Sequence, residues 1–172
     1  ASIPNSGTTA IFTGTGSQIV DLGTGRSVGT FQFDSSAQAY TFNAVAGASM
    51  SFFGTGIVNN SSSVQTFTAS GNGGGTSSGY GFENSATAAN AVFNISNGAT
   101  LAFYTNSTAG TAQITVADAR IALYDSANLQ NATVTLGAGG EMQIRDTASG
   151  GQGRVILTDS TAVLYFAGYT PP

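Results

Sequence analysis

The most informative feature of this chain of 172 residues is what it lacks: cysteine, histidine, tryptophan and lysine are all absent. Without cysteine the chain has neither a disulfide framework nor a thiolate metal site. Without histidine or lysine, the Ser-His, Cys-His and Ser-Lys pairs of nucleophilic catalysis are excluded. Histidine-based metal sites and the lysine-containing phosphate loop are excluded for the same reason. The remaining catalytic option is a pair of carboxylates.

Charge is also scarce. Only 7% of the residues are charged, and four arginines against eight acids give a net charge of −4, whereas an ordinary domain is about 25% charged. Nucleic-acid binding and contact with anionic lipid both need clustered cations, so neither partner is predicted. No apolar run approaches the roughly 18 residues of a membrane helix, so direct membrane insertion is not predicted. No cofactor is expected.

What the chain does have is a repeat of alternating apolar residues. A first apolar-x-apolar pair recurs at a nearly constant interval, and a second pair follows each first pair at a constant offset. Alternation with a period of two indicates strands with one buried face. The first pairs are Tyr80-x-Phe82, Leu101-x-Phe103, Ile121-x-Leu123, Met142-x-Ile144 and Val163-x-Tyr165, and the second are Phe93-x-Ile95, Ile114-x-Val116, Val134-x-Leu136 and Val155-x-Leu157.

A constant register favours a coil over a β-sandwich, because a sandwich does not need the same register in every repeat. The sequence therefore predicts an all-β fold: a single-stranded, right-handed parallel β-helix (β-solenoid). It would have about 21 residues per coil and roughly seven coils in one domain, residues 1–172. Successive coils would stack about 4.8 Å apart. One internal column would contain Phe82, Phe103, Leu123, Ile144 and Tyr165.

The N-terminal half is less regular. Phe31-x-Phe33 and Met50-x-Phe52 are predicted to begin successive units, but the next unit begins only at Tyr80, well beyond one further repeat length. The excess predicts an inserted, exposed loop at residues 54–79, rich in glycine, serine and asparagine. Because insertions on a regular scaffold carry functional variation, Asn72 in this loop is a binding candidate.

Two pairs of residues at equivalent repeat positions are further candidates. Asp125 and Asp146 would stack about 5 Å apart, as a weak candidate for a calcium site or a glycosidase pair. The favoured alternative is a ladder of turn-capping side chains, because Asn84 lies at the same position two repeats earlier. Tyr104 and Tyr124 point outward, where tyrosine binds sugars well but is also a favourable cross-strand neighbour.

The segment Thr105–Val116, TNSTAGTAQITV, resembles the repeats of bacterial autotransporter (type V secretion) passenger domains. Asp125–Val134 and Asn84–Ala91 resemble degenerate copies, so the resemblance covers about residues 80–166. It implies a protein that crosses the outer membrane unfolded and folds outside as a β-helix. The chain would then be a piece of a longer passenger, with a translocator barrel elsewhere in that protein. The motif carries no catalytic residue.

The sequence favours a non-enzymatic stalk, adhesin or self-association scaffold, secreted or at the bacterial cell surface. Its expected partners are a host or neighbouring-cell surface, glycans or further copies. The alternative is a carbohydrate-active β-helix, either a polysaccharide lyase or a hydrolase. An ice-binding solenoid is less favoured, because Thr66-x-Thr68 and Thr133-x-Thr135 are predicted to be isolated rather than laddered.

Overall fold

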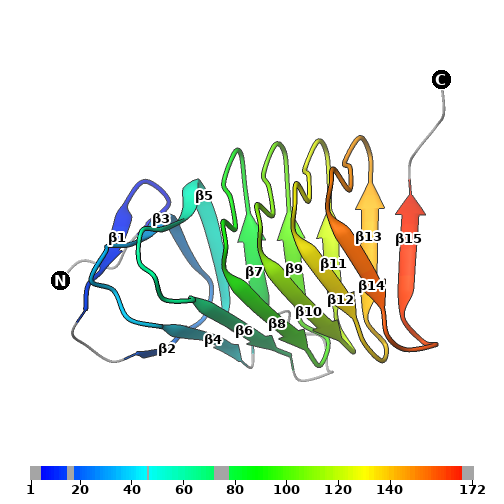
Figure 1. Ribbon diagram of the computed structural model, residues 1–172, viewed down its shortest axis with the longest axis horizontal. Coiled ribbons are helices and arrows are strands. Elements are labelled where there is room, and N and C mark those ends of the chain that lie inside the picture. Colours follow the sequence, from blue (N-terminus) through cyan, green and yellow to red (C-terminus); the bar gives the residue numbers. More distant parts are fainter. Residues whose placement is uncertain (1–4, 15–17, 46, 72–77, 168–172) are drawn as a thin grey trace.

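The computed structural model describes residues 5–14, 18–45, 47–71 and 78–167, and its strands form two parallel sheets (Figure 1). Odd-numbered strands form sheet A and even-numbered strands form sheet B, so the chain alternates between the sheets as it coils. Sheet A contains β1 (Thr9–Phe12), β3 (Arg26–Phe33), β5 (Ser49–Asn59), β7 (Gly79–Phe82), β9 (Thr100–Phe103), β11 (Arg120–Leu123), β13 (Glu141–Arg145) and β15 (Val163–Ala167). Sheet B contains β2 (Ile19–Asp21), β4 (Thr41–Val45), β6 (Thr66–Ser70), β8 (Val92–Ser96), β10 (Gln113–Ala117), β12 (Thr133–Leu136) and β14 (Arg154–Leu157).

This arrangement confirms the parallel β-solenoid of about seven coils. The predicted internal column is confirmed for Phe82, Phe103, Leu123 and Ile144, which pair in register from strand to strand. The hand of the coil stays a prediction. In the part of the chain that the structure describes, no helix is long and apolar enough to cross a membrane.

The last coil corrects the predicted register. Ile144 pairs with Phe166, and Tyr165 instead points outward and is 50% exposed. The turn that leads into β15, from Arg154 to Val163, is longer by a single residue than the paired turn from Thr133 to Glu141. Since side chains alternate along a strand, a slip of one position exchanges the two faces.

The N-terminal half corrects the predicted units. Met50 pairs with Arg26 rather than with Phe31, and Phe31 pairs with Ile57. The two long strands β3 and β5 contain a bulge, at which Val28 pairs with Phe52 but Thr30 pairs with Gly56. A bulge inserts residues into one strand only, so equal spacing in the sequence does not give equal register.

The predicted loop at residues 54–79 is wrong for most of its length, because β5 and β6 lie within it and Phe67 is fully buried. The excess residues are divided between two places. The stretch from Ser49 to Thr66 is longer than the paired stretch from Gly79 to Val92, and the stretch from Ser70 to Gly79 is longer than that from Ser96 to Thr100. Asn72 belongs to residues 72–77, which lie outside the described residues.

The turns repeat from coil to coil in left-handed backbone conformation. After the sheet A strands, Asn84, Thr105, Asp125 and Asp146 have φ between 54° and 59°. Asparagine and aspartate tolerate this region at low cost. At the turn that precedes each sheet B strand, the small residues Ala91, Ala112 and Ala132 are fully buried.

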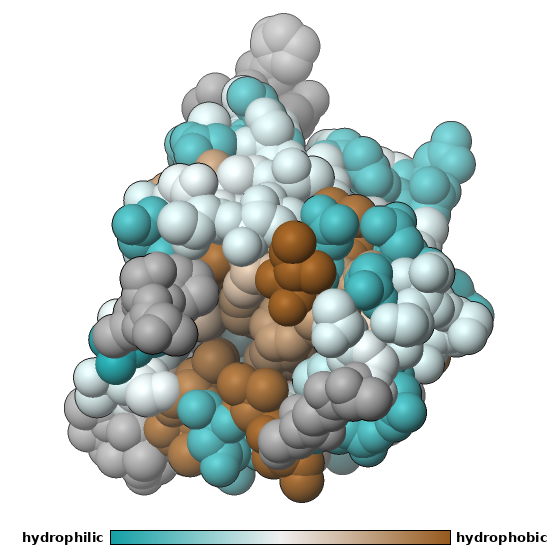
Figure 2. Space-filling view, turned by 90° about the vertical axis from the view of Figure 1, so that its left-hand side faces the viewer, coloured by the Kyte–Doolittle hydropathy of each residue, from teal (hydrophilic) through white to brown (hydrophobic). Residues whose placement is uncertain are grey.

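Both ends of the rod leave apolar core residues accessible. At the N-terminal end an apolar hollow of about 330 Å³ is lined by Phe12, Phe31, Phe42 and other residues. Figure 2 shows apolar side chains around a hollow on this end of the molecule. At the opposite end, Phe166 is 65% exposed although it continues an internal column. The apolar interior is therefore continuous with both end faces.

Candidate functional site

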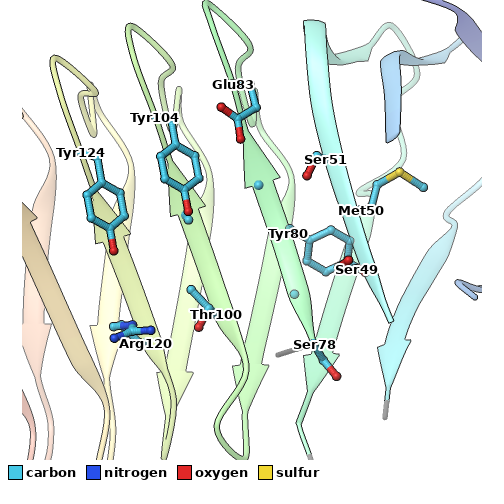
Figure 3. Close-up of a pocket in the computed structure, with 13 residues that line it drawn as sticks. Ser49, Met50, Ser51, Ser78, Tyr80, Glu83, Thr100, Tyr104, Arg120 and Tyr124 are labelled. Carbon is cyan, nitrogen blue, oxygen red and sulfur yellow. The ribbon is translucent and has the colours of Figure 1, made fainter. Parts of the chain in front are cut away.

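A groove with a volume of about 290 Å³ lies on the outer face of sheet A, from β5 to β11 (Figure 3). Its floor is formed by Ser51, Gly81 and Ala102, which pair in register at outward positions of β5, β7 and β9. None of the three has a side chain larger than the hydroxymethyl group of serine, so the outward residues on either side of them project as walls. Three neighbouring strands give a floor about 14 Å long.

One wall contains Glu83, Tyr104 and Tyr124, each of which directly follows its strand. The rings of Tyr104 and Tyr124 stack with centroids 5.0 Å apart and an interplanar angle of 5°. The guanidinium carbon of Arg145 lies 5.7 Å from the centroid of the Tyr124 ring. Because the ring faces cover one another, these tyrosines offer their edges and hydroxyls to the groove. The two predicted binding residues are thus brought together, in an orientation that does not suit face-on stacking against a sugar by both rings.

Burial raises the pKa of the Tyr104 hydroxyl, and the neighbouring Tyr124 and Glu83 raise it further, against a smaller opposing effect of Arg120. Tyr104 therefore stays protonated at neutral pH and can donate a hydrogen bond from the wall. Burial also raises the pKa of the Glu83 carboxyl, with an additional contribution from the Asp125 carboxylate.

The opposite wall contains Thr100 and Arg120. Figure 3 shows Arg120 at the same strand as Tyr124, on the other side of the groove, with Thr100 on the neighbouring strand. The Arg120 side chain is exposed and forms no hydrogen bond or ion pair with any residue that the structure describes. Its guanidinium donors are therefore available to a ligand.

The groove is closed at β13 by a chain of three side chains. The Arg145 Nε donates to Gln143 Oε1 at 2.7 Å, and the Gln143 Nε2 donates to Glu141 Oε1. Gln143 pairs in register with Ala122, so the first large residue of the floor column ends the groove. Only 6% of the Gln143 surface is exposed. This end of the groove is thus fixed by packing and by hydrogen bonds.

Asp125 and Asp146 form a capping ladder between coils. The Asp125 Oδ2 accepts a hydrogen bond from the Thr105 N–H at 2.9 Å, and the Asp146 Oδ2 accepts one from the Asp125 N–H at 3.1 Å. One oxygen of each carboxylate is therefore used by the backbone of the preceding coil. Among the described residues, no group of three or more acidic side chains is placed to hold a metal ion. The geometry matches the turn-capping alternative.

The outer face of sheet B places the two Thr-x-Thr pairs in the same two columns. Between Thr66 and Thr133, however, the first column contains Val92 and Gln113. The second column contains Asn94 between Thr68 and Thr115. The threonines share a register but do not form an unbroken array.

Sequence reasoning missed the floor and the opposite wall. The floor had a readable signal, because Ser51, Gly81 and Ala102 are the middle residues of three apolar-x-apolar pairs. No sequence signal identified Arg120 or Gln143. Their roles, as part of a wall and as the end of the groove, depend on which residues of neighbouring strands lie side by side.

Comparison of the chain with protein-family models, with curated proteins and with solved structures finds no match. The site is therefore interpreted from its own geometry.

Proposed function

We propose that this chain is a non-enzymatic segment of a secreted or cell-surface β-solenoid, an adhesin stalk whose groove on sheet A binds short saccharides. The observation that carries the proposal is the groove itself: a flat floor of small residues between two walls of hydrogen-bonding side chains. The resemblance of residues 80–166 to autotransporter passengers supports the location and the secretion route.

The chemistry of the groove suits a sugar. The floor accepts the C–H faces of the rings, and the hydroxyls of Tyr104, Tyr124 and Thr100 line the edges together with the Glu83 carboxylate. Saccharide sites combine such apolar surface with a small number of placed polar groups. Each wall residue lies on a strand of a continuous sheet or directly after one, so little freedom is lost on binding. A length of about 14 Å admits a short oligosaccharide.

A glycan array tests the proposal, with Ala102→Phe as the blocking variant. Ala102 lies in the floor between the two walls, so a phenyl ring there fills the groove, and we expect at least tenfold weaker binding. Thr115→Phe is the matched control, because Thr115 is an exposed outward residue of β10 on the opposite sheet. Equal binding by Ala102→Phe and the parent, or no glycan binding by the parent, contradicts the proposal.

The carbohydrate-active alternative has one observation in its favour, the raised pKa of Glu83 in the groove. Hydrolysis of a glycosidic bond usually needs two carboxyl groups across the scissile bond, and Glu83 is the single carboxylate of the groove lining described. A polysaccharide depolymerisation screen separates the two functions. Turnover by the parent that disappears in Glu83→Gln would make the chain an enzyme.

Self-association is the second candidate, and the exposed Phe166 at the end of an internal column favours it. Sedimentation velocity over a range of concentrations detects it. Association that is lost in Phe166→Asp would assign this end face to contact between copies, and a concentration-independent monomer would count against it.

A further inference from the structure

The two walls of the groove differ in their hydrogen-bonding chemistry along its length. At the β11 end, Arg120 and the Tyr124 hydroxyl face one another and Thr100 lies one strand away, so donors are concentrated there (Figure 3). At the β7 end, Glu83 supplies a carboxylate acceptor. Two strand spacings, about 10 Å, separate the coil of Glu83 from the coil of Arg120. A ligand that fits both ends therefore carries hydrogen-bond acceptors at its β11 end and donors at its Glu83 end.

Arg120 is the decisive residue at the donor end. Its guanidinium is exposed, has no partner among the described residues, and lies at the edge of a concave surface. The nearest acid in its own column, Glu141, accepts a hydrogen bond from Gln143. A guanidinium presents paired N–H donors that match a carboxylate in a bidentate geometry. The Tyr124 hydroxyl across the groove adds a donor at the same end.

The surrounding charge limits how many carboxylates a ligand can bring. Glu83 lines the far end of the groove, Glu141 stands on the coil beyond Arg120, and the chain has a net charge of −4. A polymer with an acid on every ring would place carboxylates beside these acids. A saccharide with one carboxylate brings a single negative charge, which Arg120 offsets although Glu141 lies on the next strand, and its neutral rings offer hydroxyl donors to Glu83.

We infer that the groove binds a short saccharide that carries a single carboxylate, such as a terminal uronic acid, with the carboxylate on Arg120. This inference rests on the proposed saccharide-binding function and names the class of ligand. The carboxylate lies at the β11 end, against the closed end formed by Gln143, and the neutral rings extend toward β7.

The experiment compares matched ligands by isothermal titration calorimetry. The probes are trisaccharides with one terminal uronic acid, together with the same trisaccharides after reduction of the carboxyl group to an alcohol. We expect the acid form to bind at least tenfold more tightly at low salt. The preference should weaken as the salt concentration rises, because screening acts on the charged ligand only.

Variants locate the effect. In Arg120→Gln the acid form should bind no better than the reduced form, and Arg120→Lys should recover part of the preference. Arg154→Gln is the matched control, because it removes the same charge from an exposed position of β14 on sheet B. Thermal melts of all three variants verify that each is folded.

The outcomes separate this inference from the proposed function. Equal binding of acid and reduced probes shows that the groove binds sugars without the carboxylate contact, which overturns the inference and leaves the function in place. A preference for the acid that survives in Arg120→Gln overturns the role of Arg120. Absence of binding to every probe, together with a blank glycan array, overturns both.

Discussion

The two halves of the rod hold the same fold with different cores. Residues 9–71 are packed with aromatic rings, and Phe67 alone has five aromatic neighbours with centroids 4.8 to 6.4 Å away. Residues 100–167 are packed with aliphatic side chains such as Ile114, Val134 and Leu136. The coils also differ in length. Along sheet B, the two coils that run from Thr41 through Thr66 to Val92 are longer than those that follow Val92.

The two inward columns of sheet B show how the change is accommodated. In the first half a phenylalanine is followed two positions later by alanine, as in Phe67 and Ala69. In the second half two residues of intermediate size stand together, as in Ile114 and Val116. The rung of Phe93 and Ile95 is the transition. Because interiors are close-packed, a phenylalanine in one column is matched by an alanine in the next at the rungs of Phe42 and Phe67, whereas the rung of Phe93 and Ile95 holds two large residues. Size is therefore balanced within the rungs of the aromatic half rather than along each column.

The largest expected effect tests whether the regular half is one packed core. Leu123→Asp places a charge at a fully buried position between Phe103 and Ile144, and should cost about 4 kcal/mol or more of unfolding free energy. Thr115→Asp introduces the same charge at an exposed outward position and should change stability little. Urea denaturation measures both. A Leu123→Asp variant as stable as the parent would show that the internal column is not closed.

The next prediction tests the balance within a rung. Ile114→Phe introduces the residue of the aromatic half beside Val116 and should cost about 1 to 3 kcal/mol through overpacking. The double variant Ile114→Phe/Val116→Ala reproduces the Phe67 and Ala69 pair and should recover most of that loss. A double-mutant cycle measures the coupling. Additive losses in the double variant would mean that neighbouring columns do not compensate each other.

The sequence predicts the regular half well because one register repeats there. Phe82, Phe103 and Leu123 are read directly from their spacing, and the left-handed turns follow from Asn84 and Asp125. In the aromatic half the bulge at Gly56 and the longer coils change the spacing without changing the strand pattern. The assumption of equal intervals therefore paired Phe31 with Met50 wrongly. It also led to the prediction of a loop where the extra residues lie partly within a strand.

The candidate site was predicted only in part for a related reason. The outward direction of Tyr104 and Tyr124 follows from alternation, so their place on the outer face at equivalent repeat positions was expected. Their mutual stacking, the end of the groove at Gln143 and the lack of a partner for Arg120 among the described residues depend on which side chains meet between coils. The repeat spacing shows which residues occupy equivalent positions in neighbouring coils, but it does not show which of their side chains touch.

A smaller effect concerns one exception within the regular half. The Ser107 hydroxyl is buried and has no hydrogen-bond partner among the residues that the structure describes. It lies at a turn position that Ala86 and Ala127 occupy in the neighbouring coils. Ser107→Ala should stabilise the protein by about 1 kcal/mol, because it removes an unsatisfied polar group. The reverse change, Ala127→Ser, should destabilise by a similar amount. Urea denaturation of both variants measures this, and destabilisation by Ser107→Ala would reveal a partner for the hydroxyl.

The smallest expected effect concerns an aspartate cap that is present in both halves of the rod. Asp34 follows β3 and Asp159 follows β14, and each Oδ1 accepts hydrogen bonds from the hydroxyl and the N–H two positions later, in Ser36 and Thr161. Those same hydroxyls accept the N–H of Gly14 and Gly139, at distances of 3.1 and 2.9 Å. The motif therefore links adjacent coils in both the aromatic and the aliphatic half.

These bonds give both carboxyls the same expected response to acid. The hydrogen bond from the Ser36 hydroxyl, and then that from its N–H, lower the pKa of Asp34 below the ordinary value of 3.8, and Thr161 does the same to Asp159. For a lowered pKa, the stabilisation is present above the unfolded-state value and is lost as the pH falls through the folded-state value. Carboxyl NMR titration should give midpoints below 3.8 for both residues. An ordinary midpoint for one of them would show that the cap between coils is formed in only one half of the rod.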